Sequence, residues 1–151
     1  MRSLILLLAA TGAAGAGDCR EGALDMRGPF GAARFDVEVA DDPEERAQGL
    51  MFVERMAPMS GMLFVYERPQ RASFWMRNTL IPLDMIFAGA DGRVTRIHEN
   101  AIPGDETPIP GGDEVKYVLE LNGGMAGRLG LSVGDEMRHP SIGPEPAWPC
   151  G

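Results

Sequence analysis

The segment MIFAGADGRVTRI, residues 85–97, decides the predicted fold. Met85 to Phe87 and Val94 to Ile97 are short runs rich in residues that favour β-strands. Between them stands Asp91-Gly92, a strong sequence signal for a tight turn that joins two antiparallel strands. The segment therefore predicts a β-hairpin, which is the repeating unit of antiparallel sandwiches and barrels.

Strand patterns continue on both sides of this hairpin. Further strands are expected at 35–39, 61–66, 72–76, 115–121 and 133–137, with a turn at 67–70 separating the second and third. Short helices are expected near 42–51, where Asp42 can cap and Pro43 suits the first turn, and at 125–131. The predicted fold is mainly β (α+β), a compact antiparallel β-sandwich or partly open barrel of about six or seven strands with two short helices.

The composition is that of one soluble domain preceded by an export signal. The 151 residues are 44% hydrophobic and 24% charged, which is ordinary for a globular protein. A basic start, a short apolar run and Ala14-Gly15-Ala16 form the pattern of a cleavable signal peptide. We expect a signal peptide at 1–16, a flexible glycine-rich lead-in at 17–33, a single domain at 34–138 and a proline-rich tail at 139–151.

These features predict a secreted or periplasmic protein. The apolar run is too short to remain as an anchor, so no stable membrane insertion is expected after signal cleavage. A net charge of −8 disfavours nucleic acid as a partner. Cys19 and Cys150 are the only cysteines, and in an oxidising compartment they predict a disulfide, although two free thiols in the terminal segments are the alternative.

Four motifs carry a resemblance to a known family. They are GLM at 49–51, GMLF at 61–64, FWMRNTLIPLD at 74–84 and YVLELNGG at 117–124. In this order they resemble the secreted or membrane-anchored prokaryotic family called domain of unknown function 192 (DUF192), or uncharacterised protein family 0127. The resemblance spans roughly residues 35–137. It implies a small β-rich exported domain and implies no function.

A set of polar residues and one tryptophan forms the first candidate site. If their strands pair, these residues could bind a small polar ligand or a sugar, with an indole as stacking platform: Arg46, Trp75, Asn78, Asp84, Glu120 and Asn122. Structural roles are the alternative. Asn78 and Asp84 could fix the turn that lies between them, and Arg46 could form a buried ion pair with Asp84 or Glu120.

A run of methionines forms the second candidate site. Met56, Met59 and Met62 recur at every third position, and two of them depart from the pattern of the resembled family. Thioethers favour Cu(I), so the run could bind that ion; packing into gaps of the core is the alternative. His98 with its acidic neighbours matches no metal template, and the isolated His139 is expected to be exposed.

The sequence thus favours a non-enzymatic role. It lacks the serine-hydrolase elbow, the zinc-protease helix motif and the phosphate-binding loop. The leading hypothesis is a binding or accessory protein of the cell envelope that recognises a small polar ligand or an envelope partner, without a cofactor. The alternatives are a Cu(I)-handling protein, and a hydrolase of envelope carbohydrate that uses Asp84 and Glu120 as paired carboxylates.

Overall fold

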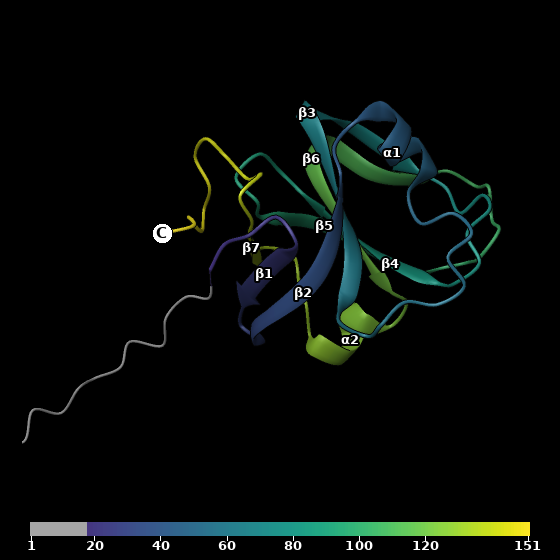
Figure 1. Ribbon diagram of the computed structural model, residues 1–151, viewed down its shortest axis with the longest axis horizontal. Coiled ribbons are helices and arrows are strands. Elements are labelled where there is room, and N and C mark those ends of the chain that lie inside the picture. Colours follow the sequence, from purple (N-terminus) through teal and green to yellow (C-terminus); the bar gives the residue numbers. More distant parts are fainter. Residues whose placement is uncertain (1–17) are drawn as a thin grey trace, which may run out of the picture.

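The protein folds as a curled seven-stranded sheet with a short helix at each end (Figure 1). The structure, a computed structural model, describes residues 18–151. The elements in chain order are β1 (Ala23–Gly28), β2 (Gly31–Ala40), α1 (Pro43–Gln48), β3 (Ser60–Phe74), β4 (Leu83–Ala88), β5 (Val94–Ala101), β6 (Ile109–Asn122), α2 (Met125–Leu129) and β7 (Glu136–Arg138). The predicted signal peptide lies outside the described residues. Within 18–151, no helix has the length and hydropathy needed to cross a membrane.

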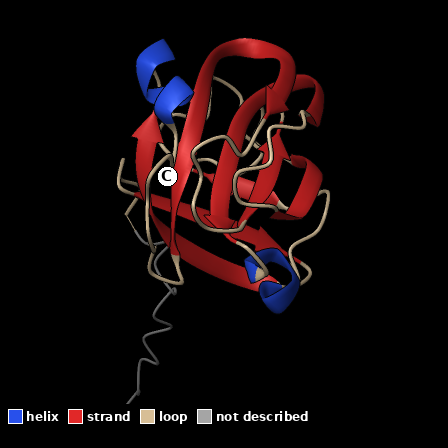
Figure 2. Ribbon diagram, turned by 90° about the vertical axis from the view of Figure 1, so that its right-hand side faces the viewer, coloured by secondary structure: helices blue, strands red, loops and turns tan. Residues whose placement is uncertain are grey.

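The strand order β5-β4-β6-β3-β2-β1-β7 forms a half-barrel, which confirms the prediction of a mainly β, partly open barrel (Figure 2). All neighbouring strands are antiparallel except β2 and β3, which are parallel and are connected through α1. The two sheet edges approach each other at one end. There Val94 N donates to Asp135 O (2.8 Å) and Met137 N donates to Gly92 O (2.9 Å).

The strands at the centre of the sheet confirm one sequence prediction and correct another. Residues 83–101 form the predicted hairpin, with Ile86 opposite Ile97. The turn expected at 67–70 is wrong, because β3 continues unbroken from 60 to 74. The pairing of β3 with β6 shifts register between Val65 and Ser73. Such bulges accommodate a proline, here Pro69, without ending the strand.

Both terminal segments of the described chain pack on the sheet, which differs from the flexible lead-in and tail expected from the sequence. β1 lies within 17–33, and its Leu24 and Met26 are fully buried. In the tail, the centre of the Trp148 ring lies 4.5 Å from the guanidinium carbon of Arg27 and 4.3 Å from that of Arg138. Glycine content suggested flexibility, but the few apolar residues of β1 suffice to bury its inner face.

Polar contacts join these two ends. The predicted disulfide is present between Cys19 and Cys150, with Cα atoms 5.6 Å apart. Asp25 accepts hydrogen bonds from Arg34 (2.6 Å) and Arg138 (2.6 Å). His139, expected to be exposed, is buried, and its Nε2 lies 2.8 Å from Glu21 O.

The sheet buries side chains on both of its faces. On one face, Leu119 and Leu121 of β6 belong to a cluster that includes Met125 of α2. On the other face, Met62 of β3 and Met85 of β4 belong to a cluster that includes Leu50, which follows α1. Because side chains alternate along a strand, neighbouring residues of β6 enter different layers. This alternation decides where the candidate site residues point.

Candidate functional site

A cavity of about 200 Å³ opens where α1 and the residues after it meet β3. Its walls come from residues 46–51, from Phe64, Tyr66, Ser73 and Phe74 of β3, and from Trp75, Arg77 and Thr79. The single lining residue from β6 is Glu120. The cavity therefore combines aromatic walls with three ionic side chains, two of them basic and one acidic.

Glu120 is the buried acidic group of this cavity. The residue is 4% exposed and is paired across the sheet with Met62 on one side and Met85 on the other. Among the residues that the structure describes, none donates a hydrogen bond to its carboxylate or forms an ion pair with it. No fully buried side-chain oxygen or nitrogen of the described residues lacks a partner, so the Glu120 oxygens are reached from the cavity. Burial raises the pKa of Glu120 to about 8. This raised pKa favours the protonated form of the Glu120 carboxyl group at neutral pH.

Arg46 extends from α1 to the cavity, but its guanidinium group donates hydrogen bonds to groups other than Glu120. Its Nη1 donates to the carbonyl oxygens of Asp41 (2.9 Å) and Val65 (3.0 Å), and its Nη2 lies 3.1 Å from Glu67 Oε1. The guanidinium carbon is 5.1 Å from the centre of the Tyr66 ring. The ion pair considered for Arg46 with Asp84 or Glu120 is thus replaced by a pair with the exposed Glu67.

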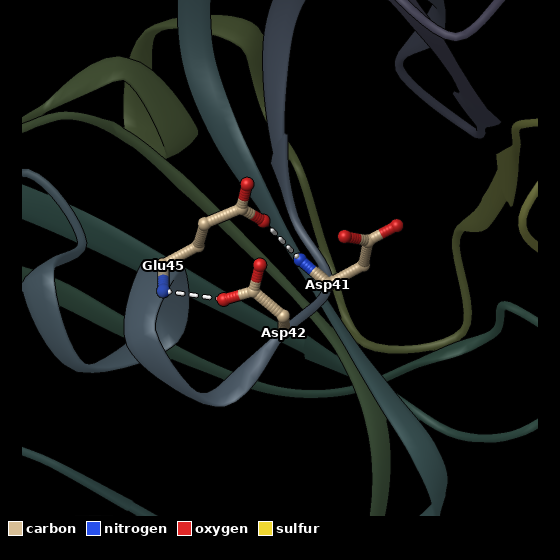
Figure 3. Close-up of side chains that lie close together, drawn as sticks. All are labelled: Asp41, Asp42 and Glu45. Carbon is tan, nitrogen blue, oxygen red and sulfur yellow. Dashed lines mark hydrogen bonds between the residues drawn. The ribbon is translucent and has the colours of Figure 1, made fainter.

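Two acidic residues fix the start of α1 and so position Arg46 (Figure 3). Asp42 Oδ1 accepts a hydrogen bond from Glu45 N (2.8 Å), and Glu45 Oε2 accepts one from Asp41 N (3.1 Å). Asp41, Asp42 and Glu45 are the group of carboxylates in 18–151 whose oxygens lie close enough together to hold a metal ion. All three are exposed, and the hydrogen bonds account for Asp42 and Glu45 as helix caps.

Tyr66 lies within the electrostatic reach of both Arg46 and Glu120. Burial raises the pKa of its hydroxyl, Arg46 opposes that rise, and the charge of Glu120 adds to it. Trp75 is 45% exposed, and the Arg77 guanidinium carbon lies 5.4 Å from the centre of its ring. The cavity thus has a buried carboxyl group, that of Glu120, and exposed side chains at Arg77 and Trp75, one cationic and one aromatic.

The structure brings half of the predicted polar set to this cavity, namely Arg46, Trp75 and Glu120. Asp84 is fully buried elsewhere and accepts hydrogen bonds from the backbone N–H groups of Asn100 (2.8 Å), Gly124 (3.0 Å) and Ala126 (2.8 Å). These bonds tie β4 to β5 and to the start of α2. Asp84 therefore has the structural role that was the alternative.

The two predicted amides also contact other parts of the fold, although the Asn78 side chain is exposed and its Nδ2 lies 3.9 Å from Met51 Sδ. Asn122 Nδ2 donates to the carbonyl oxygens of Met56 (3.0 Å) and Ala57 (3.1 Å). Asn78 has a φ of 54°, a left-handed conformation that asparagine tolerates in turns, and its carbonyl accepts from Phe52 N (2.8 Å). The backbone of Asn78 therefore takes part in the turn that follows Phe74, while its side chain approaches Met51.

Asp84 and Glu120 do not form a carboxylate pair. Asp84 is paired with Leu121, whereas Glu120 is paired with Met85, so the two carboxylates project from opposite faces of the sheet. Asp84 points toward α2, and Glu120 points toward the cavity beside α1. This arrangement lacks the facing pair that a glycosidase needs.

The methionine run is divided between the two layers. Met56 and Met62 pack with the cluster beside α1, whereas Met59 packs against the cluster beside α2. All three positions thus contribute to apolar packing. The division favours the packing role that was the alternative to Cu(I).

The sequence reasoning missed Tyr66 and Arg77. Both line the cavity, but the sequence pattern places Tyr66 only in a predicted strand, and Arg77 stands only within the motif FWMRNTLIPLD. The sequence does contain a signal for Tyr66. Tyr66 follows Met62 and Phe64 at a period of two, so it lies on the face of the sheet that also carries Glu120. That signal becomes readable only when the pairing of β3 with β6 is known.

Comparisons with known proteins identify relatives of this chain. Residues 26–139 match the sequence model of the DUF192 family, described as "Uncharacterized ACR". No curated protein matches significantly. A solved protein of unknown function from Novosphingobium aromaticivorans DSM 12444 is 46% identical with a TM-score of 0.75, over 76% of this chain and 82% of that one. One from Sinorhizobium meliloti 1021, described as a candidate transcription regulator, is 40% identical with a TM-score of 0.78, over 85% of this chain and all of that one.

Proposed function

The chain belongs to the DUF192 family, and because that family is uncharacterised, we propose from the cavity itself that this protein is a non-enzymatic binding protein for a small polar ligand. The ligand enters the cavity between α1 and β3 and is held at its inner end by Glu120. The observation that carries the proposal is the buried carboxyl group of Glu120, which has no hydrogen-bond or ionic partner among residues 18–151.

Physical reasoning explains why this observation supports a ligand. A buried acidic group without a hydrogen-bond partner lowers the free energy of unfolding. An apolar residue at the same position would make the fold more stable. Groups of this kind, with a pKa displaced by desolvation and an opening to a cavity, occur preferentially at functional sites. A polar ligand would supply the missing hydrogen bonds.

A single isolated carboxyl group supports binding better than catalysis. The hydrolase alternative requires a second carboxylate, and Asp84 projects from the other face of the sheet. The Cu(I) alternative requires converging thioethers, and Met59 packs in a different layer from Met56 and Met62. The description of the Sinorhizobium protein is not carried over, because a net charge of −8 disfavours association with DNA.

A ligand screen by NMR tests the proposal. The ¹⁵N-labelled protein is titrated with millimolar amines, carboxylates, amino acids and sugars, and we expect one of these classes to shift the amide signals of residues 46–51. Ser73 is exposed and lines the cavity, so Ser73→Trp should block the shifts. Arg71→Trp, on the same strand but outside the cavity, is the matched control. Absence of shifts from every class, or equal shifts in Ser73→Trp, would refute a binding site here.

The binding role is proposed for the cell envelope. Export is supported by the signal pattern of residues 1–16, and the Cys19–Cys150 disulfide is consistent with an oxidising compartment. Expression of the full chain in a bacterium, followed by mass spectrometry of the periplasmic fraction, should find a protein that starts at Gly17. A cytoplasmic protein that keeps Met1 or Arg2 would contradict export.

A further inference from the structure

We propose that the cavity binds a small zwitterion, a free α-amino acid, whose ammonium group bonds Glu120 and whose carboxylate bonds Arg77. This inference rests on the proposed binding function and adds the chemical class of the ligand. Three features of the cavity support it: the charges of Glu120 and Arg77, the size of the cavity, and the partners that each charged group already has.

The inner end of the cavity lacks a cation. Arg46 lines the same cavity, but it donates to Asp41 O, Val65 O and the Glu67 carboxylate. Glu120 therefore keeps its own lone pairs free. An ammonium group offers three donors and a compensating charge, which is what a buried carboxylate requires.

The outer end of the cavity offers a cation that is free to bind. The Arg77 side chain is 54% exposed, and its Nε is 3.7 Å from Glu106 Oε1, whose side chain is 60% exposed. An exposed ion pair of this length contributes little, so a ligand can replace Glu106 without much loss. Trp75 holds the guanidinium beside the cavity through a contact of 5.4 Å between the guanidinium carbon and the ring centre. A planar guanidinium in this place suits a carboxylate.

The cavity is small and its walls are aromatic. Its volume of about 200 Å³ equals that of about seven water molecules in the liquid. Phe64, Phe74 and Tyr66 also line the cavity and contribute apolar surface to its walls. This space suits the backbone of an amino acid with a short side chain and is too small for a disaccharide.

Ligands with only one charge match the cavity less well. An anion would satisfy Arg77 but leave Glu120 without a partner, and a cation would satisfy Glu120 but meet the positive fields of Arg46 and Arg77. A metal dication would find one carboxylate where it requires several oxygen ligands. A zwitterion satisfies both ends at once.

Binding of an amino acid should release a proton from the protein, and this release can be measured. Glu120 is protonated in the empty cavity at pH 7 and must ionise to pair with an ammonium group, so one proton passes to the buffer for each ligand bound. The other titratable side chains that line the cavity are Arg46 from α1, Tyr66 from β3 and Arg77. Burial raises the pKa of the Tyr66 hydroxyl further above this pH, so the released proton reports on Glu120.

Calorimetry with three matched ligands tests the inference. Alanine carries both charges, ethylamine lacks the carboxylate and propionate lacks the ammonium group. We expect alanine to bind at least about tenfold more tightly than either, because each lost charge-assisted hydrogen bond weakens binding by that factor or more. Titrations in phosphate and in Tris should differ in heat by one proton released per alanine.

Substitutions at Glu120 and Arg77 test which charged group of the ligand each residue binds. Glu120→Gln should remove the proton release and weaken alanine binding at least about tenfold, while Arg77→Gln should weaken alanine binding but leave ethylamine binding unchanged. Asp113→Asn is the control, because Asp113 is 74% exposed and pairs with Arg71 outside the cavity. The ¹³C signal of the Glu120 carboxyl group should move to its ionised position when alanine is added to the wild type.

The outcomes separate this inference from the proposed function. If ethylamine, propionate or a sugar binds as tightly as alanine at residues 46–51, the cavity is a binding site but the zwitterion is wrong. If Arg77→Gln binds alanine like the wild type, the carboxylate contact is wrong. If no member of the panel and no ligand of the broader screen shifts these residues, both the inference and the proposed function fail.

Discussion

Replacing Glu120 with glutamine should stabilise the folded protein, and the gain should grow with pH. Glutamine keeps the shape of the side chain but cannot ionise. In the wild type the folded state holds the proton up to about pH 8, whereas the unfolded state releases it near 4.5. The bound proton of Glu120 therefore contributes to the unfolding free energy of the wild type. This contribution is fully present below pH 4.5 and is lost as the pH rises to 8.

The size of the effect follows from the two pKa values. Each pH unit between them corresponds to about 1.4 kcal/mol of unfolding free energy at 25 °C. Glu120→Gln should therefore gain about 3 kcal/mol over the wild type at pH 7, and about 5 kcal/mol above pH 8. Water in the open cavity screens the carboxylate, so these are upper values. Near pH 4.5 the two proteins should unfold at similar denaturant concentrations.

Urea unfolding at pH 4.5, 6, 7 and 8.5 measures this difference. The slope of free energy against urea should be equal in the two proteins, so that the shift in midpoint reports stability alone. Glu114→Gln, an exposed position on the same strand β6, is the control and should follow the wild type at every pH. A Glu120→Gln variant that is less stable than the wild type at pH 7 would refute the reasoning, because it would mean that the carboxylate makes stabilising bonds in the fold.

Three further predictions concern the contacts that join the two ends of the chain. Burial lowers the pKa of His139, whose Nδ1 accepts from Ser141 N (3.0 Å), so stability should fall as the pH drops below about 6.5, and His139→Gln should reduce that loss in thermal melts between pH 5 and 8. Asp25→Asn should lower the unfolding free energy by about 3 kcal/mol in urea at pH 7, because it removes the buried carboxylate that accepts hydrogen bonds from both Arg34 and Arg138, whereas Asp113→Asn should change it little. Reduction of the Cys19–Cys150 disulfide, which spans 131 positions, should lower the free energy of unfolding by about 5 kcal/mol. The loss should be seen as a lower melting temperature in reducing agent. An unchanged melting temperature with both thiols titrated would contradict this.

The sequence predicted the β4–β5 hairpin and the cap of α1 because their signals are local. Asp91-Gly92 and the Asp42 cap act over a few residues, and both are found where expected. The continuous β3 was missed because Pro69 usually ends a strand, whereas here the register shift against β6 absorbs it. β1 was missed because its glycine-rich surroundings conceal a short apolar strand that is stabilised only by distant partners.

The candidate site was half predicted for a similar reason. Residue type singled out Glu120 and Asp84 alike, but only the pairing of β4 with β6 shows that they occupy opposite faces. The partners that satisfy Asp84 are backbone N–H groups of Asn100, Gly124 and Ala126, which carry no signal in the identity of those residues. Long-range register was the missing information in both cases.

The Cys19–Cys150 disulfide makes residues 19–150 a covalent ring. A single proteolytic cut in an exposed loop, such as the one at Gly104, would leave two fragments tied together and still paired in the sheet. A nicked molecule would migrate as an intact chain until it is reduced. In an environment rich in proteases, this closure lets the barrel outlast a first break in its backbone.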